Sequence, residues 1–172
     1  MKTLKFGSLL LLFFSLFSMI DNDKYGIKSD DYYMRIIIDS AKKVSGAPFL
    51  AAIVDKSSGE ILSVGVNDYL RNPILHGEMD AINKCVQKHP DVDWKNTILY
   101  TTAEPCPMCM SCIVWAGIPR VVYGASINTL KESGYHQIDI FPEYIIEKSV
   151  FYNGTIEMSP LSNECDLLFQ KK

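Results

Sequence analysis

Two short segments of the sequence contain residues that can bind a metal ion and move a proton. The first is His76-Gly77-Glu78, and the second is Pro105-Cys106-Pro107-Met108-Cys109. One imidazole and two thiolates give three protein ligands, the number that a catalytic zinc site uses when water fills the fourth position. A carboxylate two residues after the histidine can lie beside the metal without binding it. We therefore expect His76, Cys106 and Cys109 to bind zinc and Glu78 to transfer protons.

Both segments lie at the start of an expected helix, over residues 77–87 and 107–116. Cys106 and Cys109 are three residues apart, so they project from one helical face. The positive end of a helix lowers the pKa of a thiol and favours the thiolate that a metal ion requires. The two helix starts are therefore expected to face a common point.

Each motif alone has a simpler explanation. A His-x-Glu triplet is common, and a Cys-x-x-Cys pair in an exported protein is more often a disulfide or a redox pair. In this order, each at a helix start, the two match the signature of zinc-dependent nucleobase deaminases. The alternative is a secreted binding module with disulfides or a closed structural zinc site, which would need His89 or Cys112 as a fourth ligand. Cys112, and the isolated Cys85 and Cys165, are instead expected to be buried thiols.

The elements expected to position these residues alternate along the chain. Hydrophobic periodicity and turn residues predict helices and strands with the following bounds. Helices are expected at 32–44, 77–87, 107–116, 142–148 and 163–170, and strands at 49–55, 60–67, 97–101, 120–123 and around 149–157, the first two forming a hairpin. This order predicts an α/β sandwich, because each crossover helix must cover a face of the sheet.

The metal-binding motifs and their surroundings resemble the cytidine deaminase-like zinc hydrolases, in particular the branch of guanine deaminases, fungal-type cytosine deaminases and tRNA adenosine deaminases. The resemblance covers residues 32–126. It rests on Ala47-Pro48-Phe49, Gly65-Val66-Asn67, residues 75–82 (LHGEMDAI) and residues 99–109 (LYTTAEPCPMC). It implies a three-layer αβα sandwich with a central mixed sheet, one zinc per subunit, hydrolytic deamination and a homodimer or larger oligomer. It also implies that His76, Cys106 and Cys109 are the ligands and Glu78 the proton shuttle.

The resemblance further suggests which residues contact the substrate. Asn67 matches an asparagine that holds the base, and Phe49 and Trp115 are expected to pack on its faces. Trp115 resembles a tryptophan of guanine deaminases, so guanine is the favoured substrate and cytosine the second, followed by a tRNA adenosine. Gly77 departs from the family, which usually has alanine there, and the resemblance fades beyond Ser126.

Composition excludes several classes of protein. The chain has 172 residues, 48% of them hydrophobic and 22% charged, as in packed globular domains. Its formal net charge is -3, with 17 basic and 20 acidic residues, and its basic residues form no long run. A surface that follows a phosphate backbone is therefore not expected. The family resemblance implies a small nucleobase or nucleoside as the favoured partner.

The first residues differ from the rest of the chain. Residues 6–20 (FGSLLLLFFSLFSMI) carry no charge and follow Lys2 and Lys5. This run is shorter than the roughly 20 residues that span a bilayer, so a signal peptide over residues 1–20 is favoured over a permanent membrane span. We expect a polar leader at 21–31, a single deaminase domain at 32–172 and export to the periplasm or the medium. If residues 1–20 are not cleaved, a cytoplasmic or membrane-tethered enzyme is the alternative.

Overall fold

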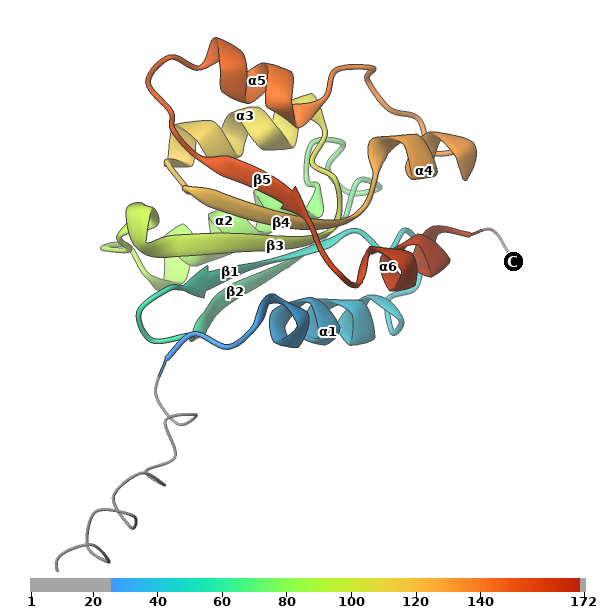
Figure 1. Ribbon diagram of the computed structural model, residues 1–172. Helices are drawn as coiled ribbons and strands as arrows, with labels where there is room; N and C mark the ends of the chain where they lie inside the picture. The colour runs from blue at the N-terminus through green and yellow to red at the C-terminus, as the bar shows by residue number, and fades with distance from the viewer. Residues whose placement is uncertain (1–25, 171–172) are drawn as a thin grey trace, which may run out of the picture.

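A computed structural model describes residues 26–170, which form a five-stranded mixed sheet with helices on both faces (Figure 1). This arrangement confirms the expected αβα sandwich. The elements are the helices α1 (Asp30–Ala41), α2 (Gly77–Lys88), α3 (Pro107–Ala116), α4 (Ile127–Glu132), α5 (Pro142–Lys148) and α6 (Ser162–Phe169), the short 3-10 helix η1 (Trp94–Asn96), and the strands β1 (Leu50–Asp55), β2 (Ile61–Val66), β3 (Thr97–Ala103), β4 (Arg120–Ala125) and β5 (Thr155–Met158).

Two hydrophobic cores form because successive strand residues point to opposite faces of the sheet. Ala52 of β1 and Tyr100 of β3 pack on one face, together with buried residues of α1, α4 and α6. Their neighbours Ala51 and Leu99 pack on the other face, against α2 and α3. The near-continuous apolar sequences of β1 and β3 follow from this burial on both sides.

The order of the strands brings several segments to one edge of the sheet. The order is β2-β1-β3-β4-β5, and β3 and β4 are parallel, so both end at the same edge. Since β1 runs antiparallel to β3, it begins there, and β2 ends there. Phe49, Asn67 and the segment that starts at Glu104 all lie next to this edge. Open α/β sheets bind ligands at the carboxyl ends of their parallel strands.

The observed elements agree with most expectations and differ at their ends. The first helix begins at Asp30 rather than residue 32, because Ser29 caps it by accepting a hydrogen bond from the backbone N–H of Tyr32 (3.4 Å). The last strand covers only Thr155–Met158, and α4 and η1 were not expected. The expected signal segment, residues 1–20, lies outside the described residues. Within 26–170, no helix has the length and hydrophobicity of a membrane span.

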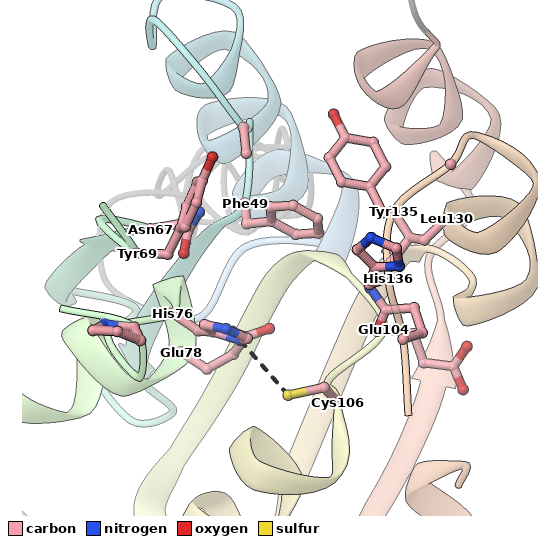
Figure 2. A pocket seen from close by; sticks show the side chains of 14 residues that line it. Phe49, Asn67, Tyr69, His76, Glu78, Glu104, Cys106, Leu130, Tyr135 and His136 are labelled. Atoms are coloured by element: carbon pink, nitrogen blue, oxygen red, sulfur yellow. Dashed lines mark hydrogen bonds between the residues drawn. The ribbon is translucent and has the colours of Figure 1, made fainter. Parts of the chain in front are cut away.

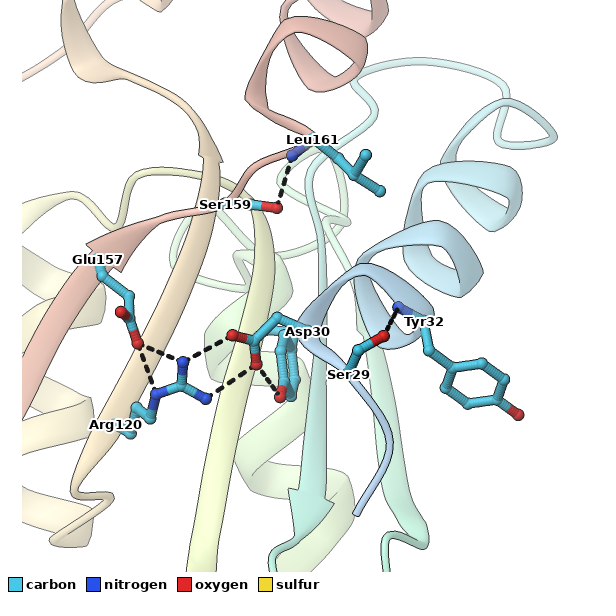
Figure 3. Close-up of polar contacts among 8 residues, drawn as sticks. Ser29, Asp30, Tyr32, Arg120, Glu157, Ser159 and Leu161 are labelled. Carbon is cyan, nitrogen blue, oxygen red and sulfur yellow. Dashed lines mark hydrogen bonds and ion pairs between the residues drawn. The ribbon is translucent and has the colours of Figure 1, made fainter. Parts of the chain in front are cut away.

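A partly buried ion pair connects α1 to the sheet (Figure 3). Arg120 of β4 donates two hydrogen bonds to the carboxylate of Asp30, at 2.9 and 2.7 Å, and Tyr100 donates a third at 2.7 Å. Arg120 also bonds Glu157 of β5. The hydrogen bonds from Arg120 lower the pKa of Asp30. Both side chains of the central pair are about 30% exposed, so solvent weakens their attraction only in part.

Replacing Asp30 by asparagine is expected to reduce the free energy of unfolding by about 1–2 kcal/mol at pH 7, the loss of a partly exposed charge-assisted contact. Because the pKa of Asp30 is lower in the folded than in the unfolded chain, its contribution is complete above about pH 5 and disappears as the pH falls below about 4. Urea unfolding of both proteins at pH 7 and pH 3 measures this difference. Asp31→Asn, the same change on the exposed neighbour, is the control and should have a smaller effect.

Candidate active site

The structure brings His76, Cys106 and Cys109 together. Both sulfur atoms lie 3.6 Å from Nδ1 of His76, and all three ligand atoms lie within 4.8 Å of one another. His76 is the N-cap of α2 and Cys106 is the N-cap of α3, and neither side chain caps its own helix. Pro107 at the first position of α3 fixes the backbone there. The three side chains therefore remain free to face a common ligand.

The two thiols differ in their protonation. A hydrogen bond from Cys109 is the main cause that lowers the pKa of Cys106 to about 4, and His76 adds to this shift. The same contact and burial raise the pKa of Cys109. The hydrogen bond to Cys106 also raises the pKa of His76. One thiol of the pair thus favours the thiolate, the form that binds metal ions.

Glu78 lies on the first turn of α2, 5% exposed. Its Oε1 accepts a hydrogen bond from the hydroxyl of Thr101, a residue of β3, at 2.8 Å. Burial is the main cause that raises the pKa of this carboxyl. A carboxyl group held at a fixed position and pushed toward its protonated form is suited to accept and return a proton.

A cavity of about 380 Å³ opens beside these residues (Figure 2). His76, Glu78 and Cys106 form one side of it, and Asn67 and Phe49 line another. The remaining lining residues are Ala47, Tyr69, Pro73, Glu104, Leu130, Gly134, Tyr135, His136 and Gln137. Its size is typical of a small-molecule site.

Two of the three residues expected to contact the substrate line the cavity, and the third does not. Asn67 and Phe49 line the cavity, and the backbone N–H of Asn67 donates to the carbonyl of Phe49 at 3.0 Å. Trp115 does not line it. Its side chain lies on the outer face of α3, 78% exposed, and packs against Phe151 with ring centroids 5.0 Å apart. The expected contact between Trp115 and a base is therefore not made within this chain, and Trp115 no longer supports a purine.

Several lining residues were not expected from the sequence. Glu104 directly precedes Pro105 and Cys106 of the second motif. This position in the sequence could have indicated that Glu104 lies near the site. Tyr135 and His136 follow α4 in a stretch with no sustained hydrophobic periodicity. Their residue types, which are common in binding sites, are therefore the only sequence signal that they could line a cavity. Tyr135 packs edge-on against Phe49 and against Phe169 of α6, which itself is buried beneath the cavity wall.

The geometry argues against a closed structural zinc site. Among the described residues, the group of adjacent ligand atoms contains His76, Cys106 and Cys109, and neither His89 nor Cys112 belongs to it. The ring of His89, at the other end of α2, instead contacts the carbonyl of Leu62 at 3.3 Å. All five cysteines are free thiols. Three ligands beside a cavity fit a catalytic site, which keeps one position open.

Gly77 has a steric role at this site. A Cβ atom there would lie 2.8 Å from the carbonyl oxygen of Phe49, closer than real side chains approach. The missing side chain thus allows the start of α2 to pack directly against the start of β1. This contact explains why the sequence has glycine between His76 and Glu78.

Gly77→Ala is expected to destabilise the fold by roughly 1–3 kcal/mol, the usual cost of overpacking. Helix propensity alone predicts the opposite sign, since alanine stabilises a helix by about 1 kcal/mol relative to glycine. Thermal unfolding measures the effect. A variant more stable than the wild-type protein would show that α2 and β1 can separate freely.

The comparisons with known proteins agree with this geometry. The sequence profile of the cytidine and deoxycytidylate deaminase zinc-binding region matches residues 27–125, more than half of the chain. The chain belongs to this family. Guanine deaminase of Bacillus subtilis is 36% identical over 100 residues, which cover 57% of this chain and 63%, less than two thirds, of the relative.

Other relatives of the chain are named for different bases. Cytosine deaminase of Candida albicans is 34% identical over 142 residues, covering 72% of the chain and 93% of the relative. tRNA-specific adenosine deaminase of Streptococcus pyogenes is 28% identical, covering 85% of the chain and 84% of the relative. The structure of guanine deaminase from Nitrosomonas europaea superposes with a TM-score of 0.73 at 20% identity, covering 98% and 96% of the two chains, which shows a common fold.

Proposed function

We propose that this deaminase hydrolyses the exocyclic amine of a free nucleobase, with guanine as the favoured substrate and ammonia as a product. The observation that carries the proposal is a cavity of base-like size that is lined by Glu78 together with His76 and Cys106, two of the three ligand residues. Guanine deaminase of Bacillus subtilis supports the choice of base. The net charge of -3 and the absence of a basic run argue against a polynucleotide substrate.

The three donor residues fit a zinc ion. Zn–N and Zn–S distances of about 2.1 and 2.3 Å at a tetrahedral angle place the nitrogen and each sulfur about 3.6 Å apart. His76 Nδ1 lies 3.6 Å from both sulfur atoms. Bound there by His76, Cys106 and Cys109, zinc would acidify a water molecule and polarise the bond under attack.

The chain's own residues supply the other steps. Glu78 accepts a proton from the attacking water and delivers it to the departing amine, so a single carboxyl serves both halves of the reaction. The hydroxyl of Thr101 holds that carboxyl in place. Asn67 offers an amide donor and acceptor to the polar edge of the base, and Phe49 offers an apolar surface to its ring.

Cytosine is the second candidate, because the match to the fungal cytosine deaminase covers nearly all of that relative. Ammonia release from guanine, cytosine, adenine and their nucleosides separates the candidates. We expect guanine to give the highest kcat/KM, with xanthine as the second product. Preference for cytosine would keep the mechanism and change the substrate. If the zinc-loaded enzyme released ammonia from none of them, the proposal would fail.

The same proposal includes the organisation of the chain. Residues 32–172 act as a single deaminase domain, residues 1–20 are a signal peptide removed on export, and the enzyme is a homodimer. The apolar run after Lys2 and Lys5 supports the export, and the family resemblance supports the dimer. The intact mass of the enzyme from its native host and its sedimentation in solution test these points.

A further inference from the structure

Glu104 connects the two halves of the cavity. It follows β3, precedes Pro105 and Cys106, and is 5% exposed. Its Oε2 accepts a hydrogen bond from the backbone N–H of Ile127, the first residue of α4, at 2.7 Å. Its own N–H donates to the carbonyl of Ala125 at 2.8 Å. Glu104 therefore joins the ends of the parallel strands β3 and β4.

The other end of this connection carries one side of the cavity. We call residues 127–137 the wall segment, because it contains five lining residues. These are Leu130, Gly134, Tyr135, His136 and Gln137. In Figure 2 the ring of His136 lies across the cavity from His76 and Glu78. The wall segment is thus the side of the cavity that faces the metal-binding residues.

Little else fixes the wall segment to the cysteine segment. Within the described part of the chain, the hydrogen bond from Ile127 to Glu104 is the one that joins the wall segment to residues 104–109. The other contacts of the wall segment lead elsewhere. Leu130 packs in the hydrophobic core, Tyr135 packs on the rings of Phe49 and Phe169, and polar contacts join Thr129 to Ser126 and Lys131 to Asp139. In Figure 2 the carboxylate of Glu104 points away from His76 and Glu78, so it does not reach the reacting groups.

We propose that Glu104 is a positioning residue, which sets the distance between the wall segment and the metal-binding side chains through the N–H of Ile127. This inference rests on the proposed deamination of guanine. A displaced wall segment would bind the base less tightly, while Glu78 and the three ligand residues would stay in place. Loss of the hydrogen bond is therefore expected to raise KM and to change kcat little.

Two variants remove this hydrogen bond from opposite ends. Glu104→Ala removes the acceptor. Ile127→Pro removes the donor, and proline suits this position, because it is the first in α4 and Ser126 before it is extended (ψ 158°). Both are expected to raise KM for guanine roughly tenfold or more, as for a lost charge-assisted hydrogen bond. The double variant should show no further increase, since both changes break one interaction.

Matched controls separate the hydrogen bond from packing and charge. Ile127→Ala removes the buried side chain but keeps the N–H, so KM should stay within about threefold of the wild-type value. Glu104→Gln keeps an oxygen acceptor and should restore most of the affinity that Glu104→Ala loses. Zinc content should stay at one per chain in all of them. A KM that rises equally in Ile127→Ala and Ile127→Pro would overturn the proposal, as would a loss of zinc in Glu104→Ala.

Amide hydrogen exchange tests the positioning without turnover. In Glu104→Ala, exchange across residues 127–137 should accelerate, whereas in Glu104→Gln it should stay slow. Unchanged exchange in Glu104→Ala would contradict the positioning role. If Glu104→Ala did not fold, the comparison of KM between Ile127→Pro and Ile127→Ala would test the positioning role instead. A wild-type enzyme with no activity on any base would refute the proposed function, and the exchange result would still stand on its own.

Discussion

Glu78→Gln is expected to keep one zinc per chain and to lose at least about 100-fold in kcat, the usual share of general acid and base catalysis. Glutamine has the same shape and still accepts the hydrogen bond from Thr101, but it cannot take a proton from water. Steady-state ammonia release and elemental analysis of the same sample measure both quantities. Thermal unfolding should show little change, which separates lost chemistry from lost folding.

Asp80→Asn is the matched control for this variant. Asp80 lies in the same turn of α2, but its carboxylate bonds the side chain of Lys84 and the backbone N–H of Val66 rather than facing the cavity. Its neutralisation should leave kcat within about threefold of wild type. A Glu78→Gln enzyme that retained a tenth or more of the wild-type kcat would show that another group moves the proton.

Cys106→Ala is expected to lose both zinc and stability. Two remaining ligands hold a zinc ion far less tightly than three, and zinc bound only to the folded chain stabilises it by mass action. Zinc content should fall from about one to less than about 0.1 per chain after dialysis. The wild-type melting temperature should fall when a chelator is added, whereas that of the variant should not change.

Cys112→Ala is the control, since Cys112 is the next thiol along α3 and lies outside the ligand cluster. It should retain zinc and its response to chelator. Stoichiometric zinc in Cys106→Ala would require a different ligand set from the one described. Equal loss of zinc in both variants would indicate damage to α3 rather than removal of a ligand.

The sequence predicts most of the fold because the main elements have strong local signals. The helix α3 is predicted with its observed bounds, since proline begins it and Gly117 ends it in a left-handed conformation (φ 77°). The five-residue connection between β1 and β2, residues 56–60, is bounded by two apolar runs. The metal-binding residues are predicted because their chemistry depends on residue type and close spacing, which a sequence displays directly.

The wall segment and Trp115 show where such reasoning stops. The helix α4 has six residues, too few for a helical period to be visible, so the wall that it begins was not expected. The helix α3 is apolar almost all round, so no polar face indicates which side is outward, and its sequence does not reveal that Trp115 lies on the exposed face. The position of the wall segment and the orientation of Trp115 both depend on tertiary packing, which the local sequence does not determine.

The central claim is that a single zinc ion held by His76, Cys106 and Cys109 drives the deamination of a base in the adjacent cavity. The most direct test starts from enzyme whose zinc has been removed by a chelator and which has then been refolded. Zinc is added back in steps, and ammonia release from guanine is measured at each step. The account predicts that activity rises linearly with bound zinc and levels off at one ion per chain. Full activity in the zinc-free enzyme, or stoichiometric zinc without ammonia release from any base, would contradict it.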